Sequence, residues 1–283
     1  MNSPTIPFPQ KRNLQAHFGL SGMPFRKNVP ANKMFDSRAQ RDLVLALVLW
    51  LEVRGLALVT GPTGVGKSIS LRKFAAQLDE QRFRVLRFNQ VPSTPMGLLR
   101  SLSRLLGLPM RRHVTDLIDQ VRDHFCTAAS GGPHTLILLD DAEGMRPDAL
   151  DVIRRLTAAD LDLEDRFSVL VTGTDDLLQT LAAPELASLK SRFGYAVTLR
   201  PFSLEDTVNY VRFHLHEAGA QSSLLSDDAV RAVFHASQGV PRQINQLVLQ
   251  ALIQATVEGR DDVDGRFMTN QIAAHPLYVR GEP

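Results

Sequence analysis

The sequence has little that would cross-link the chain or anchor it in a membrane. Cys126 is its single cysteine, so no internal disulfide can form, and no Cys/His cluster points to a metal site. We expect Cys126 to be buried, since free cysteine usually is. The longest strongly apolar run, 43–51, is far shorter than the ~18 residues of a membrane-spanning helix. The first 13 residues lack the features of a secretory signal, so we expect a cytoplasmic protein with no membrane partner.

The chain also has little excess of either charge, because its net charge is only +2. The first 50 residues differ: they contain only two acidic residues, Asp36 and Asp42. Against these stand Lys11, Arg12, Arg26, Lys27, Lys33, Arg38 and Arg41. Such a segment fits contact with a phosphate backbone or an acidic partner, although a charge run is more often a solvated face.

The hydrophobic pattern predicts an α/β protein followed by a helical module. Residues 1–35 are rich in proline and read as an extended N-terminal arm. Within 36–201, short apolar runs alternate with helical periodicity, which predicts a three-layer sandwich around a mostly parallel sheet. The expected strands are 56–60, 84–89, 135–141, 167–173 and 195–200. Residues 202–283 lack strand patterns and predict a small all-helical lid domain, with helices after Ser203 and Ser226, then over 241–257 and near 264–274.

A glycine-rich loop between the first strand and the following helix carries the strongest functional signal. Residues 61–68 read GPTGVGKS, which is the phosphate-binding pattern G-x-x-x-x-G-K-[ST]. Its members are Gly61, Pro62, Thr63, Gly64, Val65, Gly66, Lys67 and Ser68. In such a loop, backbone N–H groups surround the phosphates, Lys67 reaches the β- and γ-phosphates, and Ser68 binds Mg²⁺. The strand before it and the helix after it favour this interpretation over a plain turn, so we expect ATP and Mg²⁺ as ligands.

The third expected strand, 135–141, ends in acidic residues. Asp140 is expected on the Mg²⁺ side of the nucleotide. Asp141 is the preferred candidate for orienting the attacking water, and Glu143 is the alternative. A buried strand that simply ends in solvated acids would give the same pattern.

Three further side chains are candidates only if the loop and Asp140 form a nucleotide site. Thr174, with Thr172 as its rival, would sense the γ-phosphate, unless it serves only the turn. Arg192 stands before the last strand, where a ring-forming ATPase projects an arginine finger into its neighbour. Arg242, at the start of a helix in the lid, would reach back to the phosphates. A surface arginine is the alternative for both.

The chain resembles AAA+ ATPases of the ExeA type, associated with the general secretory pathway, and the related ATPases that regulate DNA transposition. The resemblance covers about residues 17–275, and its motifs occur in the family's order: HFGLSGMPF, GPTGVGKS, LLDDAEGM, VLVTGTDDLL, LKSRFGY, LRPFSLEDT and SQGVPRQINQL. It implies nucleotide-driven oligomerisation into a ring or helical filament, with Arg192 acting in trans and Arg242 in cis. Asp141 departs from the family's usual Glu, so we expect an ATPase with slow turnover.

The choice between the two branches rests on the chain's ending at Pro283 without a hydrophobic span, which favours the transposition branch. The main expectation is thus an ATP-dependent regulator that assembles on duplex DNA, largely independently of sequence, and recruits a transposase. Arg111 and Arg112 are candidate phosphate contacts. The alternatives are an ATPase component of an ExeA-type secretion or envelope assembly, and a scaffold that binds ATP but hardly hydrolyses it.

Overall fold

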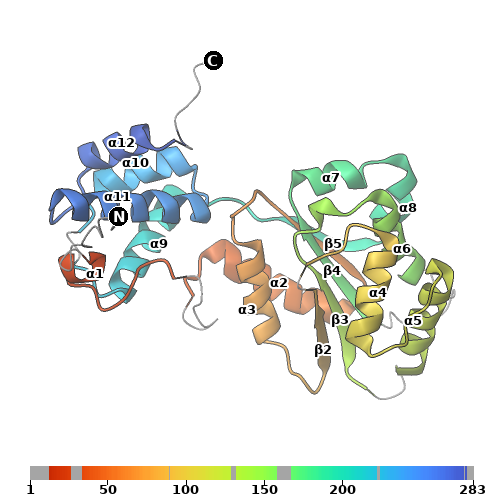
Figure 1. Ribbon diagram of the computed structural model, residues 1–283. Coiled ribbons are helices and arrows are strands. Elements are labelled where there is room, and N and C mark those ends of the chain that lie inside the picture. The colour runs from red at the N-terminus through yellow and green to blue at the C-terminus, as the bar shows by residue number, and fades with distance from the viewer. Residues whose placement is uncertain are drawn as a thin grey trace, which may run out of the picture. The chain divides into compact units, whose positions relative to one another are not determined.

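The computed structural model describes residues 13–26, 34–88, 90–128, 132–157, 167–221, 224–276 and 278 (Figure 1). The chain forms two compact units. One is Arg38–Arg200, and the other combines Met1–Ser37 with Pro201–Pro283. Lys11, Arg12, Lys27 and Lys33 of the basic N-terminal segment lie outside the described residues.

The first unit is built on a five-stranded parallel sheet with the order β2-β3-β4-β1-β5. The strands are β1 Leu56–Thr60, β2 Phe83–Arg87, β3 His134–Leu139, β4 Phe167–Gly173 and β5 Phe193–Thr198. β1 and β4 are buried along their whole length, as their continuous apolar runs predict for central strands. β2 and β5 lie at the edges and contain exposed residues, which in β5 alternate with less exposed ones.

Helices cover both faces of this sheet (Figure 1). α2 (Arg38–Val53) and α3 (Lys67–Ala76) share a core with Ala57 and Val59 of β1. The neighbouring Leu56 and Leu58 face the opposite core. That core includes α4 (Pro95–Leu106), α5 (Val114–Ala128) and α6 (Pro147–Thr157). Because alternate side chains of a strand point to opposite faces, this division confirms the expected three-layer sandwich.

Short elements complete the unit. They are the 3₁₀ turns η2 (Ala142–Gly144) and η3 (Pro184–Leu186), α7 (Asp175–Leu181) and α8 (Ala187–Lys190).

The second unit is helical, as expected. It contains α9 (Leu204–Glu217), α10 (Asp227–Ser237), α11 (Pro241–Glu258) and α12 (Gly265–Ala274). Ser203 and Ser226 cap α9 and α10, each accepting a backbone N–H in the first turn, and Ser203 forms a capping box with Asp206.

The segment 13–26 is more structured than the expected extended arm. It contains the short helix α1 (Leu14–His17), which packs against α11. Leu20 and Phe25 are buried in the core of the helical unit. The backbone N–H of Ser21 donates to the carbonyl of Ala218 at 2.8 Å. This segment thus helps to build the core of the helical unit.

The expectation that Cys126 is buried is wrong, because its side chain is exposed. α5 turns Leu117, Val121 and Phe125 toward the core, and the next residue lies about 100° around the helix from that face. Within the described ranges, every helix is too short or too polar to span a bilayer.

Candidate nucleotide-binding site

The loop of 61–68 adopts a backbone that glycine makes possible. Gly61, Gly64 and Gly66 have φ values of 147°, 83° and 113°. A Cβ on Gly61 would lie 2.4 Å from the carbonyl oxygen of Leu199, which cannot move away easily because its own N–H donates to Thr60. The loop therefore follows a fixed path from the end of β1 into the N-terminus of α3, where unpaired N–H groups favour an anion.

Lys67 is folded over this loop and only 5% exposed. Its Nζ donates to the carbonyl oxygens of Gly61 at 2.8 Å and Pro62 at 3.3 Å. Both acceptors are neutral, so they offset only part of the cost of burying an ammonium group. A phosphate would supply the missing negative charge. The loop therefore fits a nucleotide by its shape and by its charge.

Of the remaining loop residues, one is buried in the core and the others are at least partly accessible. Val65 is 1% exposed and packs into the core shared with α2 and α3. Thr63 and Ser68 are exposed, and Pro62 and Gly64 are half-buried. Ser68 is the second residue of α3 and follows Lys67 directly.

Asp140 comes directly after β3 and lies at the same edge of the sheet as the loop. One strand, β4, separates β1 from β3, so their ends are about 10 Å apart. Thr172 of β4 is fully buried, and its hydroxyl donates to Oδ1 of Asp140 at 2.6 Å. Thr172 is therefore a positioning residue for the Asp140 carboxylate. From the sequence alone, Thr172 is only the rival of Thr174 for sensing the γ-phosphate.

The two candidates for orienting water differ in their surroundings. Asp141 is exposed and has a left-handed backbone with φ of 58°, which Asp tolerates better than most residues. Its N–H donates to the Thr172 hydroxyl at 3.2 Å. Glu143 lies in η2, and its Oε2 is buried without a hydrogen-bond partner among the described residues.

Thr174, like Glu143, has a buried side-chain oxygen without a hydrogen-bond partner among the described residues. It begins α7, but its side chain makes no capping hydrogen bond, and its buried Oγ1 has no partner in the described part of the chain. η2 packs against both β4 and α7, so the two unpartnered oxygens belong to adjacent elements. Buried polar atoms are normally hydrogen-bonded, and orphans of this kind fit a site that binds a polar ligand or a water molecule.

Arg192 lies at the opposite edge of the sheet. It immediately precedes β5, whose first residue, Phe193, pairs with Leu56 at the start of β1. The loop begins about 16 Å further along the parallel strands. Arg192 is exposed, and its Nη1 donates to the carbonyl oxygen of Thr157 at 3.2 Å. It therefore lies away from the loop of its own α/β unit.

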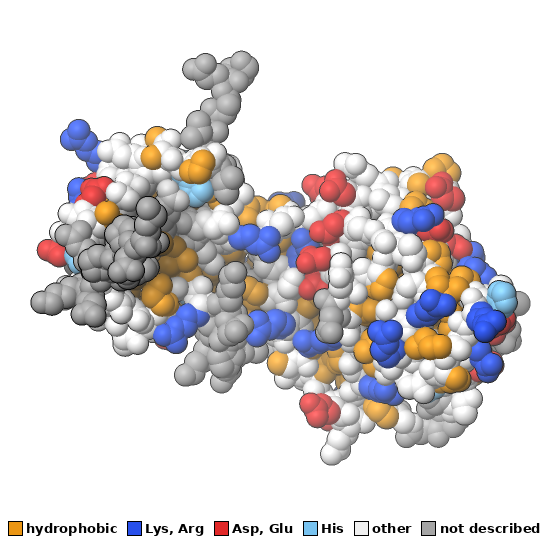
Figure 2. Space-filling model, viewed as in Figure 1, with side chains coloured by type: hydrophobic (Ala, Val, Ile, Leu, Met, Phe, Trp, Pro, Cys, Tyr) orange, Lys and Arg blue, Asp and Glu red, His pale blue; other side chains and the backbone are white. Residues whose placement is uncertain are grey.

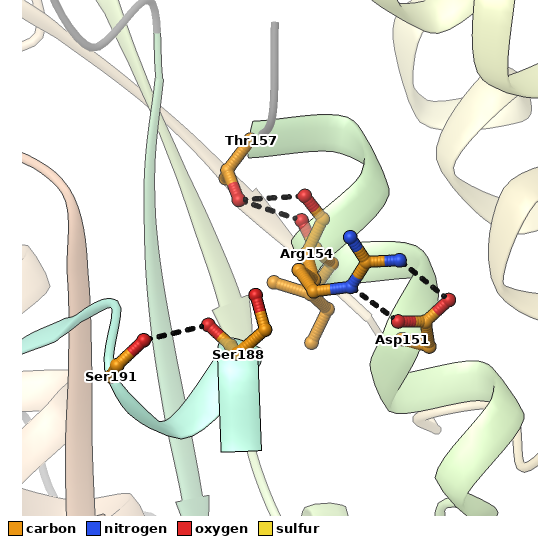
Figure 3. A network of polar contacts seen from close by, with 6 residues as sticks. Asp151, Arg154, Thr157, Ser188 and Ser191 are labelled. Atoms are coloured by element: carbon orange, nitrogen blue, oxygen red, sulfur yellow. Dashed lines mark hydrogen bonds and ion pairs between the residues drawn. The ribbon is translucent and has the colours of Figure 1, made fainter. Parts of the chain in front are cut away.

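Figure 3 shows the polar contacts near the Arg192 segment. On α6, Arg154 binds both carboxylate oxygens of Asp151, and this hydrogen bonding raises the pKa of Arg154. Thr157 donates back into α6, and Ser191 donates to the carbonyl of Ser188 on α8 at 3.0 Å. These contacts fix the ends of α6 and α8, and Arg192 lies two residues after the end of α8.

The other predicted residues belong to different elements of the chain. Arg242 is exposed in the first turn of α11, in the helical unit, and its reach toward the phosphates stays a prediction. Arg111 and Arg112 are exposed between α4 and α5. Arg111 Nε donates to Oε1 of Gln120 at 2.9 Å.

Comparisons with known proteins agree with this geometry. An AAA domain family matches residues 51–181. General secretion pathway protein A of Aeromonas hydrophila is 30% identical over 246 residues, covering 86% of this chain. The chain belongs to the ExeA-like AAA+ family. This AAA+ chain spans only 45% of the length of that curated relative.

Solved structures show the same fold at low sequence identity. The Cdc6 protein of Pyrobaculum aerophilum superposes with a TM-score of 0.66 and 17% identity over 95% of this AAA+ chain and 72% of its own. A Drosophila ORC structure bound to DNA superposes with a TM-score of 0.65 and 15% identity over 97% of this chain and 69% of its own. ORC2 of Aeropyrum pernix, in ADPNP–ADP complexes, has a TM-score of 0.63 and 14% identity over 88% of this chain and 70% of its own.

Proposed function

We propose that this chain is the nucleotide-driven ATPase module of an ExeA-type secretion or envelope assembly. One observation carries the proposal: the glycine loop with its buried Lys67 and the oriented carboxylate of Asp140 share the carboxyl edge of one sheet. The relative named general secretion pathway protein A supports the choice of assembly, because it matches 86% of this chain. The chain's ending at Pro283 is not an argument for either branch.

The residues of the carboxyl edge, together with Arg192 at the opposite edge, each have a role in this proposal. The N–H groups of 61–68 bind the phosphates, and Lys67 exchanges its carbonyl contacts for phosphate oxygens. Ser68 and Asp140 would hold Mg²⁺, which would neutralise negative charge on the phosphate oxygens. Asp141 or Glu143 orients the attacking water, and Thr174 donates its free hydroxyl to that water or to the phosphate. Arg192 completes the site of a neighbouring copy.

The proposed reaction is tested by replacing Asp140 with Asn, which keeps the side-chain shape and removes the charge. We expect Asp140→Asn to lower the ATP turnover in Mg²⁺ at least about 100-fold, while calorimetry still detects ATP binding through the loop. Asp228→Asn, on the exposed surface of α10, is the matched control and should leave turnover unchanged. Equal turnover in wild type and Asp140→Asn would refute the assigned role.

A second candidate function is the ATP-dependent, DNA-binding regulator of transposition. It is favoured by one feature of the chain, an arginine-rich stretch without acidic residues at 81–115. Sedimentation with ATP, Mg²⁺ and duplex DNA, followed by capture of a co-expressed transposase, would support it. Binding to a membrane protein of a secretion assembly, with no effect of DNA on oligomer size, would favour the first candidate.

A further inference from the structure

A group of arginines on the α/β unit belongs to a segment other than the loop of 61–68. Residues 81–115 contain seven arginines and no Asp, Glu or Lys. Two of the seven are set aside: Arg82 pairs with Glu52 at 3.1 Å, and Arg87 points to the other face of β2. The remaining five are Arg84, Arg100, Arg104, Arg111 and Arg112, and we call them the α4 arginine face.

These five side chains come from adjacent elements. Arg100 and Arg104 are one turn apart on the exposed side of α4, whose opposite side buries Leu99 and Leu102. Arg84 of the edge strand β2 donates through Nη2 to the carbonyl oxygen of Leu105 at 3.3 Å, which brings it to the end of α4. Arg111 and Arg112 follow α4 in the connection to α5.

Direct ion pairs do not neutralise this face within the described part of the unit. None of the five arginines forms an ion pair with a described residue. The contacts found for Arg84 and Arg111 are to neutral oxygens. Acidic residues resume only at Asp116, in the first turn of α5. Figure 2 shows Lys and Arg side chains over the side of the sheet unit that carries α4.

We infer that the α4 arginine face binds the phosphate backbone of double-stranded nucleic acid, independently of its sequence. Guanidinium groups pair with phosphate in a bidentate geometry, and the basic residues of this stretch are all arginine. The 12 residues of α4 extend about 18 Å, long enough to follow several phosphates along a duplex.

An anionic membrane is the competing partner, and the surface suits it less well. Membrane-binding surfaces combine basic residues with apolar side chains that enter the lipid. Among the described residues of 81–115, Met110 is the only large apolar side chain that is strongly exposed, at 50%. The arginines therefore have almost no apolar neighbours for insertion.

The test is the salt dependence of binding to a fluorescent duplex of about 30 base pairs, measured by anisotropy with the full chain. Five phosphate contacts predict a slope of log K against log salt near −4.5, so affinity should fall about 500-fold between 50 and 200 mM salt. Arg100→Gln/Arg104→Gln should reduce that loss to about 40-fold and weaken binding at 50 mM salt.

The control is Arg212→Gln/Arg231→Gln, which removes two exposed arginines that pair with Asp227 and Asp228 in the helical unit. It should leave the slope and the affinity unchanged. Thermal unfolding and ATP binding without DNA should be the same in all variants, so failure of this inference is distinct from failure of the proposed ATPase.

Three outcomes would overturn the inference. They are no duplex binding at 50 mM salt, an unchanged slope in Arg100→Gln/Arg104→Gln, and an equal loss in the control variant. Vesicles of phosphatidylglycerol and phosphatidylcholine are the comparison partner. Arginine-dependent co-sedimentation with these vesicles, with no duplex binding, would assign the face to a membrane instead.

Discussion

The two edges of the sheet carry different parts of the proposed chemistry. At the carboxyl edge, Lys67 is buried and Asp140 is oriented by Thr172, while Glu143 and Thr174 have oxygens without a partner among the described residues. At the amino edge, Arg192 is exposed, and its Nη1 donates to the carbonyl of Thr157. One edge is thus organised within the chain to receive a ligand, and the other presents its cation outward. From this comparison we expect one copy of the chain to bind ATP by itself, whereas full turnover should require a second copy that supplies Arg192.

The largest effect that tests this division concerns Arg192. If Arg192 acts on a neighbour, Arg192→Ala should lower the turnover by about 10³-fold and leave ATP affinity unchanged. Mixing Arg192→Ala with Lys67→Ala, each inactive alone, should restore part of the turnover, because some interfaces then combine an intact loop with an intact arginine. Weakened ATP binding in Arg192→Ala alone, or no recovery of turnover in the mixture at any ratio, would contradict the claim that Arg192 acts on a neighbouring copy.

The next effect concerns the positioning of Asp140. Thr172→Val keeps the shape of the buried side chain but removes its hydroxyl, so Asp140 loses the hydrogen bond at 2.6 Å. We expect a 10–100-fold weaker response of turnover to Mg²⁺, as is typical when a group that orients a metal ligand is lost. Thr180→Val, on α7, where the hydroxyl donates to the carbonyl of Asp176, is the matched control. An unchanged Mg²⁺ dependence would show that the Asp140 carboxylate does not need Thr172.

The helical unit should respond to pH through His214. This ring contacts Phe25 and Tyr210, and burial lowers its pKa to about 4. The unfolded His, with a pKa near 6.5, binds more protons between these values. Stability is therefore complete above pH 6.5 and declines as pH falls toward 4, with a loss of roughly 2 kcal/mol at pH 5.

Chemical denaturation at pH 7 and pH 5 measures this loss. His214→Phe should reduce the difference between the two pH values, whereas His216→Phe, on the exposed side of α9, should retain it. Identical pH dependence in His214→Phe and wild type would contradict the assignment to His214.

The smallest effect separates the two candidates for orienting water. Asp141→Glu should raise turnover several-fold if residue 141 orients the water, because the longer side chain extends the carboxylate by one methylene. Glu143→Gln should lower turnover if the unpartnered Oε2 of Glu143 does so. A fast wild-type enzyme that is unaffected by Asp141→Glu would remove the expectation of slow hydrolysis.

Much of this arrangement was predictable from the sequence because it depends on local patterns. The strands over 56–60 and 167–173 have the expected bounds, since apolar runs and nearby glycines define them. The glycine loop also follows from its own residues, whose φ values require glycine at 61 and 66.

The remainder depends on the order of the strands, which no local pattern specifies. Thr172 meets Asp140 only because β4 lies between β1 and β3, and Arg192 lies away from the loop only because β5 pairs in parallel with β1. The exposure of Cys126 depends on which way α5 faces, a rotation that the average burial of cysteine does not predict.

ATP binding by Lys67→Ala tests the central claim most directly. Titration calorimetry of wild type with ATP and Mg²⁺ should give one binding event, and Lys67→Ala should weaken it at least about 100-fold, since a buried cation facing phosphate is lost. Lys190→Ala, an exposed lysine on α8, should bind like wild type. Equal ATP affinity in wild type and Lys67→Ala would contradict the account.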